Sequence, residues 1–272
     1  MSLWLHLSSF FPHNPPRLNS HAAAAAAALT TVSISGLAAI ALRIKSTDKN
    51  NTCSQSVMWA SLSLSTDSTV DPKTGVSFPD VTKDGRRLMG IGLRKASLLG
   101  LKSLDIYAFG VYCDGNGMKE LSDKYGAIPV SELQKSREFV GDVRDQDIGI
   151  TVRLQIVYGR LSIGSVRSAF EKSVGSRLKK FSGSDDKVLL GRFTSMFKDE
   201  YKLPKGSVIE ISREKGYVLV TKIDGKVVGQ VQSKLLCQSV LDLYFGEDPF
   251  DRKAKENIQY GLASTLLERA KL

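Results

Sequence analysis

Two polar side chains, Arg94 and Tyr107, stand out because each lies inside an otherwise apolar segment. Residues 90–112 read GIGLRKASLLGLKSLDIYAFGVY, and the arginine precedes the tyrosine by thirteen positions. A guanidinium can donate two parallel hydrogen bonds to a carboxylate, and a phenol can donate a third. An unpaired charge among apolar side chains is costly, so Arg94 needs an anionic partner or access to solvent. The sequence leaves open whether that partner is a ligand or an acidic side chain of the chain itself.

The two segments that carry these residues are expected to be neighbouring strands. They span Arg87–Ser97 and Leu104–Cys113, and a turn over residues 99–101 would join them as a hairpin. Because side chains alternate between the faces of a strand, each polar side chain shares a face with apolar neighbours. If the two faces meet one cleft, Arg94 and Tyr107 converge in apolar surroundings.

The glycines before Arg94 also resemble the start of a dinucleotide-binding loop. The third glycine of that motif is replaced by Lys95, and the segment lies within a strand instead of at a strand-to-helix turn. We therefore interpret Gly90 and Gly92 as positions where another element packs closely against the strand.

Histidine and cysteine usage excludes several catalytic classes. The three histidines all lie within the first 21 residues: His6, His13 and His21. If that region is removed, histidine metal sites and nucleophiles paired with histidine are excluded. The three cysteines are far apart and form no CxxC spacing: Cys53, Cys113 and Cys237. This argues against a disulfide framework and a zinc site, and we expect no metal and no cofactor.

The basic excess is moderate and spread along the chain. The net charge is +10 over 272 residues, and 42% of residues are hydrophobic, which is enough for a sizeable core. The densest basic group, Arg177, Lys179 and Lys180, falls at the end of an expected helix, where cations complement the helix dipole. No nucleic-acid-binding motif accompanies it, so no nucleic-acid partner is expected.

The N-terminal region has the composition of a targeting segment. Residues 1–45 contain Ser, Pro, Ala and a few Arg, and the first acidic residue is Asp48. This composition is typical of an organelle transit peptide. Residues 22–42 are uncharged, so a membrane anchor is an alternative, and a secretory signal is a third. Residues 46–73 read as a linker, and residues 74–272 as one folded domain.

Within that domain the element pattern predicts an α+β fold. Besides the hairpin above, the expected strands are Val76–Phe78, Gly149–Tyr158, Val208–Ser212, Tyr217–Ile223 and Lys226–Gln232. The expected helices are Met118–Tyr125, Val130–Lys135, Ser162–Phe181, Lys187–Phe197, Ser233–Phe245 and Phe250–Ala270. This order favours a mainly antiparallel sheet with helices covering one face. Apolar residues at every fourth position predict the buried stripe of the longest central helix: Val166, Phe170, Val174 and Leu178.

Several blocks of the chain resemble the chalcone isomerase family. They are GIGLRK with IYAFGVY, ITVRLQIVYGRLSIGSVRSAFEKSV, FKDEYKLPKGS, and SKLLCQSVLDLYFGEDPFDRKAKENI, in the family's order. The resemblance implies an open-faced β-sandwich, with a large antiparallel sheet covered by a layer of helices and a ligand cleft between them.

The resemblance also implies that the isomerase's polar groups are mostly missing. The family's arginine is kept as Arg94, but Tyr107 stands where the enzymes have threonine. Ser162, Ala169 and Leu243 fall where the enzymes have tyrosine, asparagine, and threonine or serine. A cleft without those donors should not position a chalcone for ring closure, so we expect no catalytic residues and no isomerase activity.

The arginine–tyrosine pair is similar instead to that of the family's non-catalytic, fatty-acid-binding branch. That likeness implies a free fatty acid whose carboxylate is held by Arg94 and Tyr107, with assistance from Ser173 on the long helix. It also implies a plastid protein of the chloroplast stroma, in keeping with the transit-like N-terminus. We expect a monomer without stable membrane insertion. Two alternatives remain: a residual isomerase-type enzyme acting on a carbonyl substrate, and a non-catalytic regulatory partner of another enzyme.

Overall fold

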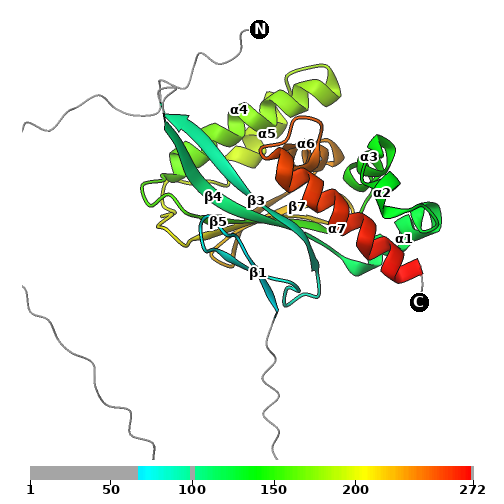
Figure 1. The fold of residues 1–272 in the computed structure, drawn as a ribbon. Helices are drawn as coiled ribbons and strands as arrows, with labels where there is room; N and C mark the ends of the chain where they lie inside the picture. Colours follow the sequence, from blue (N-terminus) through cyan, green and yellow to red (C-terminus); the bar gives the residue numbers. More distant parts are fainter. Residues whose placement is uncertain (1–66, 99–101, 271–272) are drawn as a thin grey trace, which may run out of the picture. The chain divides into compact units, whose positions relative to one another are not determined.

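A six-stranded antiparallel sheet with helices packed on one face forms the body of the protein (Figure 1). The computed structural model describes residues 67–98 and 102–270. The strands are β1 (Ser68–Val70), β2 (Ser77–Pro79), β3 (Arg87–Leu98), β4 (Lys102–Cys113), β5 (Ile150–Ile156), β6 (Val208–Glu214), β7 (Val218–Ile223) and β8 (Lys226–Gln232). The helices are α1 (Gly115–Tyr125), α2 (Val130–Leu133), α3 (Arg137–Asp145), α4 (Ile163–Ser182), α5 (Lys187–Thr194), α6 (Lys234–Phe245) and α7 (Arg252–Ala270).

The sheet is open, because its strand order β3-β4-β5-β6-β7-β8 leaves β3 and β8 as edges. Every neighbouring pair is antiparallel, so short connections suffice between β3 and β4 and from β6 through β8. On the other face a small β1–β2 pair contributes Phe78 to a second apolar cluster with Leu93 and Ala108. The predicted α+β class and open-faced sandwich are confirmed.

The register of the first hairpin sets the position of Arg94. Antiparallel pairing places Arg94 directly opposite Tyr107, and Gly92 opposite Phe109. A register shift follows between Arg94 and Lys95. Residues directly opposite on paired strands project to the same face, so the arginine and the tyrosine lie side by side. The turn predicted over residues 99–101 lies outside the described residues.

Helix α7 packs directly against β3, and glycines make this approach possible. A Cβ atom at Gly92 would overlap Ala254 and the ring of Phe109, and one at Gly261 would overlap the backbone of Met89. A Cβ at Gly90 would meet the backbone nitrogen of Ile258 at 2.9 Å. The interpretation of the glycines as close-packing positions, and not as a nucleotide loop, is therefore confirmed.

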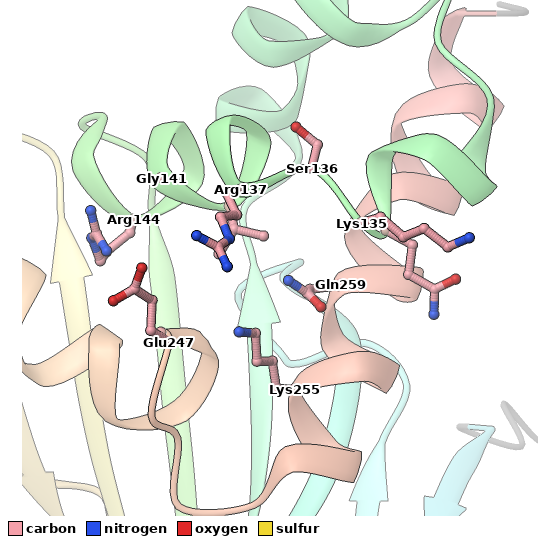
Figure 2. Close-up of a pocket in the computed structure, with 11 residues that line it drawn as sticks. Lys135, Ser136, Arg137, Gly141, Arg144, Glu247, Lys255 and Gln259 are labelled. Carbon is pink, nitrogen blue, oxygen red and sulfur yellow. The ribbon is translucent and has the colours of Figure 1, made fainter.

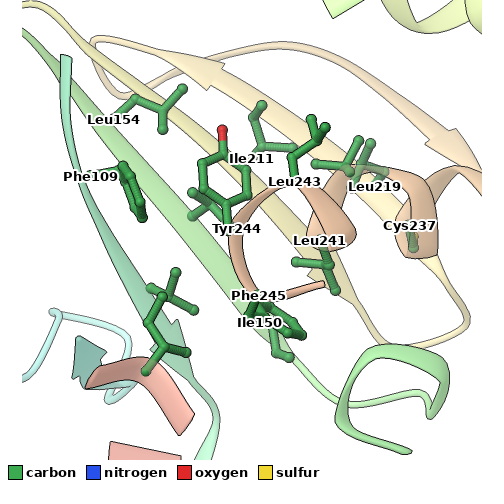
Figure 3. Packing of buried hydrophobic residues seen from close by; sticks show 14 of the residues in the cluster. Phe109, Ile150, Leu154, Ile211, Leu219, Cys237, Leu241, Leu243, Tyr244 and Phe245 are labelled. Atoms are coloured by element: carbon green, nitrogen blue, oxygen red, sulfur yellow. The ribbon is translucent and has the colours of Figure 1, made fainter. Parts of the chain in front are cut away.

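The core lies between the sheet and the helices. The predicted stripe of α4 is buried at all four positions, and its Phe170 packs with Phe193 and Phe197 at ring-centroid distances of 5.5 and 5.2 Å. Helix α6 is buried along almost its whole length, and its apolar side chains pack against the sheet (Figure 3). A helix with apolar residues on more than one face is typically buried on several sides.

Two elements differ from the sequence-based expectations. Helix α3 was not predicted, although Ser136 caps its N-terminus by accepting from the amide of Phe139, and Phe139 and Val143 are fully buried. Strand β1 lies inside the segment predicted to be linker, so the folded region begins before Thr74. Residues 1–66 lie outside the described part, and with them the predicted targeting segment and most of the linker.

A buried carboxylate joins the helices. Asp242 of α6 is fully buried and pairs with Arg177 Nε at 2.8 Å and with Arg144 Nη1 at 3.2 Å. Lys180 Nζ lies 3.9 Å from the same carboxylate. The cations near the end of α4 therefore do more than complement a helix dipole, because they bind α4 to α6 while Arg144 adds α3.

Candidate ligand-binding site

Arg94 lies on the helix-covered face of β3, close to the start of α7. The carboxylate of Asp251 accepts from the backbone amide of Leu93 at 3.2 Å and from that of Ala254 at 3.1 Å. The first contact supplies a partner to an edge-strand amide, and the second caps the first turn of α7. Residue 94 is thus held against the connection that leads from α6 into α7.

The guanidinium of Arg94 stacks on an aromatic ring and forms no ion pair with the described residues. Its Cζ atom lies 3.8 Å from the centroid of the Phe250 ring. Within residues 67–98 and 102–270, no acidic side chain pairs with it and no hydrogen bond satisfies its five N–H donors. One structural alternative to a ligand, an internal carboxylate, is therefore not found in the described part of the chain. The other, an arginine of an edge strand that reaches solvent, is consistent with the half-buried position of Arg94.

Tyr107 extends the site towards α6. Its ring meets that of Phe109 edge-on at 6.5 Å, and its hydroxyl lies by that of Tyr244. Burial raises the pKa of Tyr107, and the nearby Arg94 cation opposes this rise. Burial likewise raises the pKa of Tyr244 well above its ordinary value. Both phenols consequently stay protonated at neutral pH and can donate hydrogen bonds.

The Tyr244 hydroxyl is buried without a well-aligned hydrogen-bond partner among the described residues. It points away from the α6 backbone, towards Leu154 and Ile211 of the sheet (Figure 3). The ring also contacts those of Phe109 and Phe250 edge-on, at 5.0 and 5.6 Å. The Tyr107 hydroxyl interacts with the Tyr244 hydroxyl, so the two phenols lie together beside Arg94.

Ser173, the third predicted ligand residue, is placed differently. Its hydroxyl donates to the carbonyl of Ala169 at 2.8 Å, which is the usual back-bond of a serine within a helix. No described contact joins it to Arg94 or Tyr107. The structure therefore brings together two of the three predicted residues, while the role of Ser173 stays a prediction.

The positions that correspond to isomerase donors have local roles. Ser162 caps α4 by accepting from the amide of Ser165 at 3.1 Å, and Leu243 is buried in the core. Sequence reasoning missed Tyr244 and Phe250, which supply the aromatic surroundings of Arg94. Their signal was the aromatic cluster LYFGEDPF, but only the fold shows which strand it meets.

Two cavities in the described residues lie away from Arg94 and Tyr107. One of about 320 Å³ lies between α3 and α7 (Figure 2), and one of about 250 Å³ lies between α4 and α5. Aromatic side chains pack beside the arginine–tyrosine pair instead. A long ligand would therefore have to displace some of them.

Within the described part of the chain, no helix is both long and apolar enough to cross a membrane. No three or more His, Cys, Asp or Glu side chains gather there in a way that could hold a metal ion.

The fold and the arginine-bearing hairpin define the class of protein to which the chain belongs. The family model described as chalcone isomerase like matches residues 85–259, and the chain is a member of this family. That span includes the hairpin, the long helix α4, α6 and the start of α7.

Individual relatives carry two kinds of name. The chain is 55% identical over 207 residues to fatty-acid-binding protein 1 of Arabidopsis thaliana, covering 76% of this chain and 74% of that protein. It is 36% identical to chalcone isomerase-like protein 1 of Humulus lupulus, covering 65% and 82%. The crystal structure of an Arabidopsis thaliana fatty-acid-binding protein matches with a TM-score of 0.71 and 55% identity, over 74% of this chain and 99% of that one.

Proposed function

We propose that this protein is a non-catalytic binder of free fatty acids, with the ligand carboxylate held by Arg94 and Tyr107. The observation that carries the proposal is the Arg94 guanidinium, which lies opposite Tyr107 and pairs with no described carboxylate. Arg94 is half-buried, so its charge is partly removed from water and no described carboxylate offsets that loss. A ligand carboxylate would offset it, and the similarity to proteins named for fatty-acid binding supports that choice.

The proposed acyl chain lies among the side chains around Phe109, Tyr244 and Phe250. Each buried methylene contributes about 0.8 kcal/mol, so the chain supplies most of the affinity. The charge-assisted hydrogen bonds contribute about 1.5–3 kcal/mol each and set the choice and orientation of the head group. Because aromatic rings now pack beside Arg94, ligand entry requires that some of them change rotamer, with Phe250 the first candidate.

We infer the lack of catalysis from the residues at the positions that correspond to isomerase donors and from the ring stacked on Arg94. Ring closure of a chalcone needs polar groups that orient a polyphenol and a water molecule, whereas Leu243 and Phe250 are apolar and Ser162 is used as a helix cap. We further propose a monomer in the plastid stroma that acts without a nucleic-acid partner, with residues 1–45 as the transit peptide. The composition of that segment supports this location.

Mass spectrometry of lipid extracted from the freshly purified full chain tests the proposal. We expect co-purified free fatty acid, and saturable uptake of added fatty acid after delipidation. Finding neither would overturn fatty-acid binding and favour a partner of another enzyme. Incubation of the same sample with a chalcone should give no ring closure above the spontaneous rate, and measurable turnover would refute the non-catalytic assignment.

A further inference from the structure

The cavity between α3 and α7 has the charge and the chemistry of a second anion site. Its volume is about 320 Å³, and its walls come from the start of α3, the first turns of α7 and the connection between α6 and α7. We refer to it as the α3–α7 cleft. Arg137, Lys255 and Gln259 reach into its space from two sides (Figure 2). None of the three lines the Arg94 site.

The cations of the cleft are not neutralised by the described residues. Neither Arg137 nor Lys255 forms an ion pair within the described part of the chain. The acid that lines the cleft, Glu247, accepts a hydrogen bond from Lys180 Nζ at 3.3 Å. Lys180 is the main cause of the lowered pKa of Glu247, and Arg137 and Lys255 lower it further. Glu247 thus has its own partner, and the charges of Arg137 and Lys255 remain for a ligand, with Lys135 as a third lining cation that forms no ion pair in the described part of the chain.

Gln259 adds a hydrogen-bonding group to the cations of the cleft. Only 8% of this residue is exposed, and its amide forms no hydrogen bond with any described residue. Figure 2 shows the amide directed into the cleft, near Arg137 and Lys255. The amide nitrogen and oxygen are not among the fully buried polar atoms of the described residues that lack a partner, so both are accessible from the cleft. A ligand in the cleft can therefore form a hydrogen bond with either atom.

We propose that the α3–α7 cleft binds a phosphate monoester, either as a free metabolite or as a lipid head group. A phosphate monoester carries between one and two negative charges at neutral pH, which suits a cleft lined by several cations without an ion pair. The guanidinium of Arg137 can grip two phosphate oxygens in parallel, and Lys255 adds a point charge. Gln259 donates to a phosphate oxygen or bonds a neighbouring hydroxyl, because an amide can do either. A monocarboxylate would leave one of the cations unmatched.

Titration of the full chain with glycerol phosphate tests the proposal, followed by calorimetry or by amide shifts in NMR spectra. We expect saturable binding of glycerol phosphate, and none of glycerol or acetate at the same concentration. Arg137→Gln and Lys255→Gln should each weaken binding about tenfold, as expected for one charge-assisted hydrogen bond. Lys253→Gln is the matched control, because Lys253 is exposed on the same helix and does not line the cleft. An equal loss in this control would reduce the effect to general charge and overturn the proposal.

Gln259→Leu separates a binding role from a structural one. Because the amide forms no hydrogen bond with a described residue, its replacement should leave the melting temperature nearly unchanged. The same variant should bind glycerol phosphate less tightly. A variant that melts as the wild type does and binds equally well would remove Gln259 from the site and refute the assignment.

A second arm identifies the source of the phosphate. Sedimentation with phosphatidylcholine vesicles, with and without phosphatidic acid, is compared with the glycerol phosphate titration. Binding in either arm that is lost in Arg137→Gln and kept in Lys253→Gln supports the proposal and names the source. Absence of such binding in both arms overturns it, whatever the outcome of the fatty-acid experiments.

Discussion

Replacing Arg94 by methionine should separate free fatty acids from their methyl esters. In the structure Arg94 contacts Phe250 at 3.8 Å and pairs with no described carboxylate, so the unliganded protein gains only the cation–π contact, worth about 0.5–2 kcal/mol. Methionine keeps an apolar stem and a sulfur that can contact the same ring, which offsets part of this loss. Folding stability should therefore change little, and the effect should appear in binding.

The expected size follows from the interactions removed. A charge-assisted hydrogen bond contributes about 1.5–3 kcal/mol, and 1.4 kcal/mol corresponds to a factor of ten, so a free acid should bind roughly 10–150-fold more weakly. A methyl ester cannot ionise, and its affinity should stay within about threefold. Arg94→Lys should fall between, because an ammonium keeps the charge but cannot form two parallel hydrogen bonds.

Competition against a fluorescent fatty-acid analogue would measure both ligands on the same protein. Lys95→Gln is the matched control, because Lys95 is the next residue, is exposed, and pairs at 3.7 Å with Asp105 instead of facing the site. It should bind acid and ester as the wild type does. If Arg94→Met weakened acid and ester equally, or if Lys95→Gln had the same effect on the acid, the carboxylate clamp would be refuted.

Three further predictions concern the same framework. Burial raises the folded-state pKa of Tyr107 above its ordinary value of about 10. The proton, and any stability or binding linked to it, is therefore kept below about pH 10 and lost only as the pH rises through the higher value. Fatty-acid affinity should stay flat between about pH 7 and 10, and a decline there that is absent from Tyr107→Phe would contradict this. Asp242→Asn leaves Arg144 and Arg177 without their buried carboxylate and should lower the free energy of unfolding by about 3–5 kcal/mol in urea titrations. A loss below about 1 kcal/mol would show that the cluster contributes little. Asp248→Asn, at an exposed carboxylate, is the control. Gly92→Ala places a methyl group against Ala254 and Phe109 and should destabilise the fold by about 1–3 kcal/mol, whereas Gly141→Ala, where an added Cβ meets no atom within 4 Å, should not.

Local patterns predicted the elements well where one face of each element is plainly apolar. The strands that carry Arg94 and Tyr107, and the stripe of α4, follow from alternation and from the helical repeat. Sequence patterns do not predict helix α3 because it has only nine residues, most of them polar or charged. Its few buried residues form too short an apolar pattern to stand out from the neighbouring short segments. Its Ser136 cap and the spacing of Phe139 and Val143 were the usable signals.

The composition of the site was less predictable than its central pair. Arg94 and Tyr107 are joined by strand register, which sequence alternation can anticipate. Phe250 and Tyr244 meet them only because α6 and α7 fold back over the first hairpin from the far end of the chain. The same holds for Asp242, whose two arginine partners come from two different helices. Contacts of this kind depend on how helices pack on a sheet, and no local pattern encodes them.

The connection between α6 and α7, residues 246–251, reaches both proposed sites within a few residues. Glu247 lines the α3–α7 cleft, Phe250 covers the Arg94 guanidinium, and Asp251 binds the amide of Leu93. A fatty acid that displaces the Phe250 side chain therefore acts on the same short connection that carries one wall of the cleft. Where binding of one ligand shifts this connection, the two ligands are thermodynamically linked, and the factor by which phosphate changes fatty-acid affinity must equal the factor by which fatty acid changes phosphate affinity. Measuring both factors would show whether this short connection makes the protein a binder of one ligand at a time or of two together.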